Sequence, residues 1–249
     1  MTNLLRLQQL AKLLDVTRLQ DDETNASFDS WTASLPAISA AAYCVYPQYL
    51  MSLLNWPARQ KQSAIATVVN FPTGDLPEEQ VCQQIQQALS AGATEIDCVL
   101  PYKMLLRGEY NAVKSFLQSV RKACADKCLK IIIESGELNT AQQITIASEL
   151  VIEAGADFIK TSTGKVPVGV TEEAVRIILS VIAASKRHIG FKASGGVRSV
   201  EQALNIVQLY EDLTGNIALS SGLRIGASAL VYELAEQIAA QSSAPHFVS

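Results

Sequence analysis

The stretch Gly155–Lys165, with the sequence GADFIKTSTGK, places a lysine inside a short apolar run that ends in a glycine-containing turn. Residues Asp157–Ser162 are typical of a β-strand, and Thr163–Lys165 is typical of the loop that leaves it. A charged amine in a buried strand costs free energy, so Lys160 requires either an ionic partner or a chemical use.

A second lysine recurs in the next predicted strand. The segment His188–Lys192 is apolar and ends in Lys192, and Gly195 and Gly196 follow it at a turn. Two lysines thus lie on successive predicted strands, each followed by a glycine turn, and this pattern is the main candidate for a functional site.

Predicted strands and helices alternate about eight times along the chain, with no change in composition that marks a linker. This alternation favours an α/β fold, a single-domain (β/α)8 TIM barrel over residues 1–249, with an extra N-terminal helix at Leu4–Leu14 and a flexible tail from about residue 241. A doubly wound open sheet is the alternative, but no GxGxxG motif follows the first strand. The expected strands are Leu13–Leu19, Ser39–Tyr46, Ala64–Asn70, Glu95–Leu100, Lys130–Glu134, Asp157–Ser162, His188–Lys192 and Ser220–Gly226.

Composition excludes several classes of function. The net charge of -4 and the absence of a basic stripe argue against nucleic-acid binding. The sequence contains no apolar run of the roughly 18 residues needed to cross a bilayer, so no membrane association is expected. Five cysteines without paired spacing are typical of a reduced, cytoplasmic protein.

A metal site is also not expected. The chain has only two histidines, one of them His246 near the C-terminus, and this is too few for a His-rich centre. Cys124 and Cys128 are spaced as C-x3-C, which we interpret as neighbours on one helix rather than as half of a zinc site. The chemistry is therefore expected to use amines and carboxylates, without a metal or an organic cofactor.

A barrel predicts where the functional residues lie, because active sites form at the C-terminal ends of barrel strands. Phosphate often binds to the loops after the seventh and eighth strands, where free backbone N–H groups precede a helix. These loops carry Gly195 and Gly196, and Gly226–Ser228. The polar residues near predicted strand ends are Asp15, Thr17, Cys44, Asn70, Asp97, Glu134, Lys160 and Lys192.

The paired lysines suggest amine chemistry. A lysine at its reference pKa of ~10.4 is neutral in only about 4 molecules in 10,000 at pH 7. A second ammonium group and an apolar wall lower the pKa, and a neutral Lys160 amine could then attack a carbonyl to form an imine. Asp97 could move protons or position water.

Structural alternatives remain open for each of these residues. Lys160, Lys192 and Asp97 could form an ion-pair network that only stabilises the barrel. Cys44 could be a small core residue. The other open assignments are an N-cap or turn role for Asp15, a hydrogen-bonding role toward a neighbouring backbone or lysine for Glu134, and a solvated loop position for Lys165.

The segment Phe158–Lys165, FIKTSTGK, resembles the motif of the deoxyribose-phosphate aldolase family. The resemblance spans nearly the whole chain in order. Its further segments are Leu14–Thr17, Cys44–Pro47, Val69–Pro72, Glu95–Asp97, Gly190–Lys192, Gly195–Arg198 and Arg224–Ser228.

The resemblance implies a class I aldolase on a (β/α)8 barrel, which reversibly cleaves 2-deoxy-D-ribose 5-phosphate to D-glyceraldehyde 3-phosphate and acetaldehyde. It implies the Schiff-base role for Lys160, the pKa-lowering role for Lys192 and the proton-relay role, with water, for Asp97. It also implies a phosphosugar and an aldehyde as partners and allows a homodimer. The substrate-binding residues that we expect are Asp15, Thr17, Cys44, Asn70, Thr163, Gly164, Lys165, Gly195, Gly196, Gly226 and Ser228.

Three departures from the family pattern lead to further expectations. Ala193 and Ser194 stand where Pro-Ala is usual, which predicts a looser turn after Lys192. Ala229 stands where a second phosphate-contacting serine is common, which predicts weaker phosphate binding. The segment 244–249 lacks a C-terminal tyrosine that assists proton transfer in some members.

Two other functions are compatible with the same residues. One is a related Schiff-base lyase with another phosphosugar or aldehyde donor, and the other is a catalytically silent sugar-phosphate binding protein. A metal-dependent aldolase is disfavoured by the two histidines.

Overall fold

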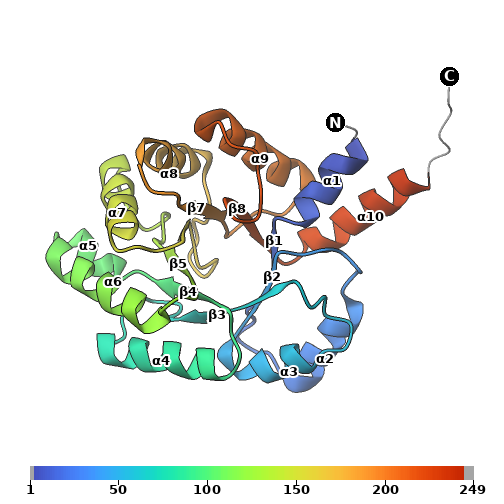
Figure 1. The fold of residues 1–249 in the computed structure, drawn as a ribbon, viewed down its shortest axis with the longest axis horizontal. Coiled ribbons are helices and arrows are strands. Elements are labelled where there is room, and N and C mark those ends of the chain that lie inside the picture. The colour runs from blue at the N-terminus through green and yellow to red at the C-terminus, as the bar shows by residue number, and fades with distance from the viewer. Residues whose placement is uncertain (1–2, 244–249) are drawn as a thin grey trace.

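Eight parallel strands close into a barrel in which each strand pairs with the next and β8 pairs with β1. The structure is a computed structural model that describes residues 3–243, and Figure 1 shows the strands at the centre with the helices around them. The predicted (β/α)8 fold is therefore confirmed. The strands are β1 Leu14–Arg18, β2 Ala42–Val45, β3 Ala64–Val69, β4 Glu95–Val99, β5 Cys128–Ile132, β6 Phe158–Lys160, β7 Gly190–Ala193 and β8 Leu223–Ala227.

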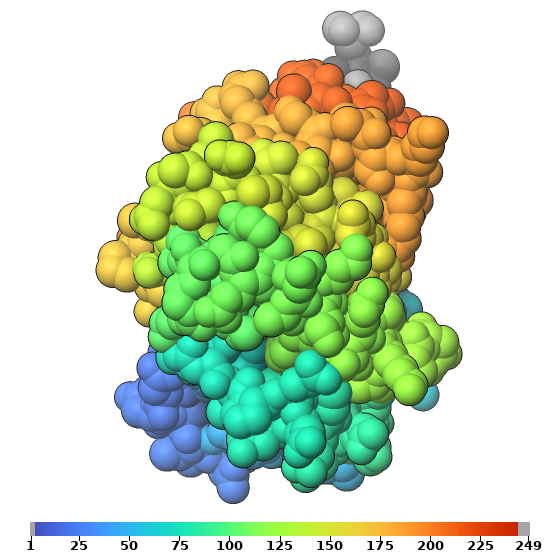
Figure 2. Space-filling model, turned by 90° about the vertical axis from the view of Figure 1, so that its left-hand side faces the viewer, coloured from blue at the N-terminus to red at the C-terminus, as the bar shows by residue number. Residues whose placement is uncertain are grey.

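The helices form the outer wall, and consecutive units lie side by side, so the colours follow one another in chain order over the surface in Figure 2. The N-terminal helix α1 packs against α10, next to the place where β1 and β8 close the barrel. The helices are α1 Asn3–Ala11, α2 Asn25–Ser34, α3 Leu50–Asn55, α4 Glu78–Ser90, α5 Tyr102–Leu106, α6 Tyr110–Cys124, α7 Ala141–Glu153, α8 Glu172–Ala184, α9 Val200–Thr214 and α10 Leu230–Ser242, with a short 3-10 turn, η1, at Pro47–Tyr49.

Local sequence signals define several helix starts. The side chains of Thr24, Thr140, Thr171 and Ser199 each accept a hydrogen bond from a backbone N–H in the first turn of the helix that follows. Such N-caps satisfy N–H groups that have no partner inside the helix. The caps therefore fix where α2, α7, α8 and α9 leave the barrel loops.

The main hydrophobic core lies between the outer face of the strands and the inner faces of the helices. In α6, for example, Val113, Leu117 and Val120 are fully buried, as is Ile131 of β5. Fully burying one such side chain contributes about 1.5–3 kcal/mol relative to leaving it exposed. This apolar layer supports the barrel, so its interior is free to carry other groups.

The barrel interior carries charges because of the strand register. Lys160 pairs with Lys192 across β6 and β7, and Lys192 pairs with Arg224 across β7 and β8. Asp97 pairs with Lys130 across β4 and β5. Residues in register on neighbouring parallel strands point to the same face, so these side chains meet inside the barrel.

Some details differ from the expectations. Cys124 ends α6 and Cys128 begins β5, so the interpretation of these two cysteines as neighbours on one helix is wrong; the turn at residues 125–127, with φ of 48° at Ala125, separates them. Helix α5 was not predicted because its five residues are too few to set up a periodicity.

The C-terminal region is described only in part. Helix α10 continues to Ser242, and the remainder of the tail predicted from about residue 241, which includes the segment 244–249, lies outside the described residues. Within residues 3–243, no helix is long and apolar enough to cross a bilayer.

Candidate active site

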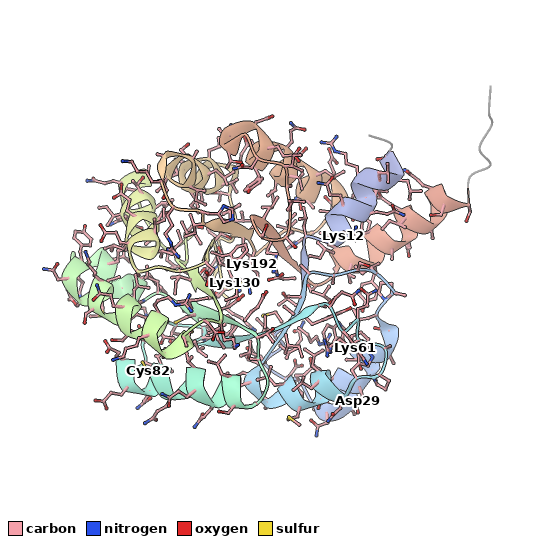
Figure 3. The ribbon with its side chains drawn as sticks, in the orientation of Figure 1. Lys12, Asp29, Lys61, Cys82, Lys130 and Lys192 are labelled. Carbon is pink, nitrogen blue, oxygen red and sulfur yellow. The ribbon has the colours of Figure 1, made fainter. Side chains whose placement is uncertain are left out.

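Seven charged side chains meet inside the barrel and form what we name the buried charge network: Asp15, Glu95, Asp97, Lys130, Lys160, Lys192 and Arg224. They come from β1, β4, β5, β6, β7 and β8, and all are buried. In Figure 3, Lys130 and Lys192 lie at the centre of the barrel, whereas Lys12 and Lys61 lie away from this centre.

Asp97 is the centre of this network. Its Oδ2 atom accepts hydrogen bonds from Lys160 Nζ at 2.8 Å and from Lys192 Nζ at 2.7 Å. Its Oδ1 atom accepts from Lys130 Nζ at 2.9 Å. The two lysines predicted to act together are therefore held on one carboxylate oxygen, and Asp97 lies directly between them.

A second part of the network lies deeper in the barrel. Asp15 Oδ2 lies 2.6 Å from Lys192 Nζ, and Asp15 Oδ1 accepts from Arg224 at 2.7 Å. Arg224 also donates to Glu95 Oε1 at 3.0 Å, and Lys130 donates to Glu95 Oε2 at 2.5 Å. Two chains of contacts thus run from Arg224 to Asp97, one through Asp15 and Lys192 and the other through Glu95 and Lys130.

The three lysines differ in the number of carboxylates that they contact. Within 4 Å, Lys130 contacts Asp15, Glu95 and Asp97, and Lys192 contacts Asp15 and Asp97. Lys160 contacts Asp97 alone among the described carboxylates. An opposite charge favours the ammonium form, so Lys160 is the lysine least able to keep its proton.

The pKa shifts follow this order. Burial and the neighbouring charge of Lys192 lower the pKa of Lys160, and together they outweigh the opposing effect of Asp97. Although burial also disfavours their charged forms, the pKa of Lys192 is raised by Asp15 and Asp97, and that of Lys130 by Asp97, Glu95 and Asp15. The arrangement therefore supplies one deprotonatable amine beside lysines that stay charged.

A cavity of about 320 Å³ opens above Lys160 at the C-terminal end of the strands. A larger groove of about 880 Å³ lies on the outer surface between α7 and α8, and none of its lining residues belongs to the network. We therefore assign the site to the smaller cavity. Its lining residues are Thr17, Leu19, Gln20, Lys160, Thr163, Gly164, Lys165, Ser194, Gly195, Gly196, Val197, Arg198, Gly226, Ala227 and Ser228.

Two glycine-containing loops form one wall of this cavity and touch each other. The N–H of Val170 donates to the carbonyl of Gly195 at 2.8 Å. Gly195 has φ of 81°, and a Cβ atom there would lie 2.9 Å from the Cβ of Ser162. Only glycine fits at this contact, which leaves the loop backbone beside the cavity where it can approach an anion.

Several hydrogen bonds are made by the turn after Lys192, for which Ala193 and Ser194 predict a looser conformation than Pro-Ala. The Ser194 hydroxyl donates to the carbonyl of Ser162 at 2.6 Å. The Thr161 hydroxyl donates to the carbonyl of Ser194 and accepts from its N–H, both at 2.9 Å. These bonds connect the turn after β7 to the loop after β6.

Glu134 holds the loop after β6 from below. Its carboxylate accepts hydrogen bonds from the N–H of Thr163, at 3.1 Å, and from the Thr163 hydroxyl, at 2.6 Å. Burial raises the pKa of Glu134, although the bonds from Thr163 oppose this shift. The structure thus places Glu134 in the hydrogen-bonding role that we considered, just beyond the end of β5 rather than within the strand.

Lys165 bridges the mouth of the cavity. Its Nζ atom lies 2.7 Å from Asp21 Oδ1, which also accepts from the Tyr46 hydroxyl at 2.9 Å. The bridge joins the loop after β6 to the loop after β1 and to the end of β2. It places the cation at the rim, next to the glycine loops.

Not every predicted site residue reaches the cavity wall. Cys44 lies in a small apolar cluster inside the barrel, where burial raises its pKa to about 11. Asn70 links its own loop to β4, because its amide donates to Val99 O at 2.8 Å and accepts from Leu76 N–H at 2.9 Å. Asp15, Asp97 and Lys192 lie beneath the cavity, and the other predicted substrate-binding residues line it.

Three network members were missed by the sequence analysis, namely Glu95, Lys130 and Arg224. Each of these charged residues lies at the start of an apolar strand or within it, as Lys160 does. A charged residue in an apolar run was therefore the sequence signal that could have identified them. Glu95 and Arg224 fall within the family-like segments, but their burial depends on strand register, which a single sequence does not determine.

Comparison with known proteins identifies relatives of this chain. A deoxyribose-phosphate aldolase from Agrobacterium fabrum (strain C58 / ATCC 33970) is 40% identical over 231 residues, which cover 91% of this chain and 89% of that protein. The structure of deoxyribose phosphate aldolase from Aeropyrum pernix, described as tetrameric, is 25% identical with a TM-score of 0.76, and the match covers 94% of this chain and 93% of that one.

A third relative extends the comparison of the fold. An apo-form structure from Toxoplasma gondii ME49 has a TM-score of 0.87, covers 97% of this chain and 98% of its own, and at 22% identity shows the fold alone. A comparison with protein families matches residues 8–228 to the description DeoC/LacD family aldolase. The chain is therefore an aldolase, a lyase, and belongs to the DeoC/LacD family.

Proposed function

We propose that this aldolase reversibly cleaves 2-deoxy-D-ribose 5-phosphate to D-glyceraldehyde 3-phosphate and acetaldehyde through a Schiff base on Lys160. One observation carries the proposal: Lys160 lines the cavity, contacts Asp97 as its one described carboxylate, and lies beside the charged Lys192. The named Agrobacterium relative supports the choice of substrate.

The chemistry begins with a neutral amine. Lys160 attacks the C1 aldehyde of the open-chain sugar, and loss of water gives a protonated imine. The C3 hydroxyl then loses its proton, the C2–C3 bond breaks, and its electron pair passes to the imine nitrogen, which leaves an enamine and releases D-glyceraldehyde 3-phosphate. Protonation of the enamine at carbon and attack by water release acetaldehyde and restore the amine.

Each step needs a proton to be moved close to the Lys160 nitrogen. Asp97 is 2.8 Å from that nitrogen, so we assign it the proton relay, with water as the carrier to the substrate. Lys192 remains charged between Asp15 and Asp97, so it repels a proton on Lys160 and stabilises Asp97 as the carboxylate. The pKa of Asp97 is held well below its usual range by Lys130, Lys160 and Lys192, against the opposing effect of burial.

The phosphate is assigned to the glycine loops. Backbone N–H groups near Gly164, Gly195 and Gly196 and the side chain of Ser228 would hold it, with Lys165 at the rim. Thr17 lines the same cavity and is assigned to the sugar hydroxyls, whereas Asp15 reaches them only through a displacement of its network partners. We retain Cys44 beside the acetaldehyde end and Asn70 as the residue that shapes the loop after β3.

We infer a metal-independent enzyme of deoxyribonucleotide catabolism that works in the cytoplasm, as one barrel domain over residues 1–249. We also infer assembly into a homodimer, while the Aeropyrum relative is described as a tetramer. The five free cysteines agree with a reducing compartment.

The test is a coupled assay that measures D-glyceraldehyde 3-phosphate formed from 2-deoxy-D-ribose 5-phosphate. Wild-type protein should turn over, with full activity in EDTA, and Lys160→Met should have no measurable activity. A panel of other phosphosugar donors identifies a related lyase, since that enzyme would prefer another donor. Thermal stabilisation by the substrate without any turnover would instead identify a binding protein and overturn the proposal.

A further inference from the structure

Arg224 lies at the inner end of the network and does not line the cavity. Its guanidinium group donates to Asp15 at 2.7 Å, to Glu95 at 3.0 Å and to the carbonyl of Ser220 at 2.5 Å. Its Cζ atom lies 5.4 Å from the centre of the Phe158 ring. With these contacts the guanidinium is fixed on several sides and holds two carboxylates at once.

Glu95 is the partner that balances Arg224. Both of its carboxylate oxygens accept hydrogen bonds from Arg224, and its Oε2 atom also accepts from Lys130. Lys130 then donates to Asp97, the carboxylate that holds Lys160. Glu95 is thus connected to Asp97 through Lys130. Asp15 is connected to Asp97 through Lys192, and Arg224 contacts Asp15.

The network contains four basic side chains and three carboxylates, so one positive charge is in excess when every group is ionised. Loss of one proton removes the excess, and Lys160 is the lysine with the fewest carboxylate partners. The charge that makes this loss favourable is therefore distributed over the whole network rather than held by Lys192 alone.

We propose that Arg224 and Glu95 are positioning residues that set the proton occupancy of the Lys160 amine from the far end of the network, through Asp15, Lys192, Lys130 and Asp97. This inference rests on the proposed Schiff-base function of Lys160. It assigns a role in the reaction to two residues that do not line the substrate cavity.

Other titratable groups also act on Lys160, and they come from several elements. Asp97 of β4, Lys192 of β7 and Cys44 of β2 act on the amine directly, and Lys130 of β5 donates to the same Asp97 carboxylate as Lys160 does. Glu134, in the loop after β5, interacts with Lys160 without an ion pair within 4 Å. These groups are common to all the variants below, so differences between variants report on Arg224 and Glu95.

The two residues have opposite charges, so their removal should have opposite effects. Arg224→Met removes a positive charge, which makes the Lys160 ammonium easier to keep, and the acid limb of kcat/KM should move to higher pH by about one unit. Glu95→Gln removes a negative charge and should move the limb to lower pH by a similar amount. A purely structural role would lower activity without shifts of opposite sign.

The experiment compares the pH dependence of kcat/KM for cleavage of 2-deoxy-D-ribose 5-phosphate in wild type, Arg224→Met, Glu95→Gln and the double variant. The double variant restores the charge balance, so its acid limb should return to that of wild type. Arg224→Lys keeps the charge but loses the fork geometry, and its limb should also match wild type even if its stability falls.

The inference is overturned if the single variants shift in the same direction or not at all, or if the double variant behaves like either single variant. If Arg224→Met does not fold, the acid limbs of Glu95→Gln and the double variant are compared instead. The limb of Glu95→Gln is expected to shift, and the limb of the double variant is not. Thermal unfolding of each variant identifies loss of fold.

A parallel measurement separates this inference from the proposed function. Borohydride reduction with substrate is applied to the same wild-type protein, and the labelled residue is mapped. Label on Lys160 without shifts in the variants contradicts the roles of Arg224 and Glu95 alone. Absence of label from Lys160 contradicts the proposed function itself.

Discussion

Three lysine side chains inside the barrel differ in the number of carboxylates that lie near each amine. Lys130 has three carboxylates within 4 Å, Lys192 has two, and Lys160 has one. Only Lys160 of the three lines the cavity. A nucleophilic amine and a stabilising ion-pair network are thus compatible, because the same carboxylate serves both.

The ion-pair network that we considered as an alternative is therefore present, and it includes all three residues assigned to catalysis. Lys160, Lys192 and Asp97 do form mutual contacts. Network formation alone, however, does not explain why one of its lysines has a lowered pKa and faces an open cavity. A use for the amine explains both.

Removing the neighbouring ammonium group tests this at the residue scale. In Lys192→Met, Lys160 loses a repelling charge and retains Asp97, so the pKa of Lys160 should rise. Less of the amine is then neutral near pH 7, and the acid limb of kcat/KM should move to higher pH, by about one unit or more. The pH–rate profile of the cleavage reaction measures this shift.

Lys12→Met is the matched control, because Lys12 is exposed and lies away from the central lysines, as Figure 3 shows. Its pH–rate profile should coincide with that of wild type. A Lys192→Met enzyme with an unchanged acid limb would show that Lys192 does not lower the pKa of Lys160.

At the scale of elements, the loop after β6 connects Lys160 to the cavity wall to which we assign the phosphate. The loop begins directly after Lys160 and carries Thr163, Gly164 and Lys165, and only two residues separate Lys160 from Thr163. Glu134 holds this loop from inside, and the contact between Val170 and Gly195 joins it to the loop after β7. In the proposed function, phosphate binding would therefore depend on hydrogen bonds that do not involve the phosphate.

Glu134→Gln tests the support of this loop. A glutamine keeps the shape but weakens the acceptor toward the Thr163 N–H and hydroxyl, a loss of roughly 1–2 kcal/mol. We expect KM for 2-deoxy-D-ribose 5-phosphate to rise by about tenfold, with a smaller fall in kcat. Steady-state kinetics give both constants, and the unphosphorylated sugar is the control, because its KM should change less. Equal rises for the two sugars would contradict a role in phosphate binding.

The bridge between Lys165 and Asp21 makes a separate prediction. Asp21 is exposed and competes with a phosphate for the Lys165 ammonium, so Asp21→Asn should lower KM for the phosphorylated substrate by up to about threefold. The melting temperature should stay the same, because exposed ion pairs contribute little to stability. The decrease in KM should disappear at high salt; a rise in KM would mean that Asp21 contacts the substrate or orders the mouth.

The sequence predicts most elements because their signals are local. Strand β3 begins at Ala64 as expected, and β4 begins at Glu95 as expected. Helix α5 was missed because it is short, and the Cys124–Cys128 pair was misassigned because a turn separates α6 from β5. The other strand ends shifted by one to three residues, since hydrogen bonding to neighbouring strands sets them.

The whole molecule is a barrel with an apolar outer layer and a charged interior. Barrel interiors are usually filled by branched apolar side chains, whereas this one is filled near its centre by ion pairs. The sequence predicted Lys160, Lys192 and Asp97 from their unusual positions. It did not predict that Lys130, Glu95 and Arg224 would join them, because their contacts depend on the closure of the barrel.

The charged interior predicts how stability depends on pH. Lys192, Arg224 and Lys130 hold the pKa of Asp15 below its usual range, although burial acts in the opposite direction. A depressed carboxyl pKa contributes stability that is present above the unfolded pKa of ~3.9 and is lost as the pH falls toward the folded value. The free energy of unfolding should therefore decrease on acidification below about pH 4.

Asp15→Asn should be less stable than wild type at neutral pH by about 3–5 kcal/mol, because buried cations lose their partner. Its stability should also change less on acidification, since one of the titrating groups is gone. Urea unfolding at a series of pH values gives both quantities. Parallel pH dependences in wild type and variant would rule out Asp15 as a source of the acid sensitivity.

The central claim is that Lys160 is the amine that forms the Schiff base, and the most direct measurement is borohydride trapping followed by peptide mapping. The wild-type protein is mixed with 2-deoxy-D-ribose 5-phosphate, reduced and digested, and the modified residue is located by mass spectrometry. We predict a single reduced adduct on Lys160. An adduct on Lys130 or Lys192, or full turnover with no adduct, would contradict the account.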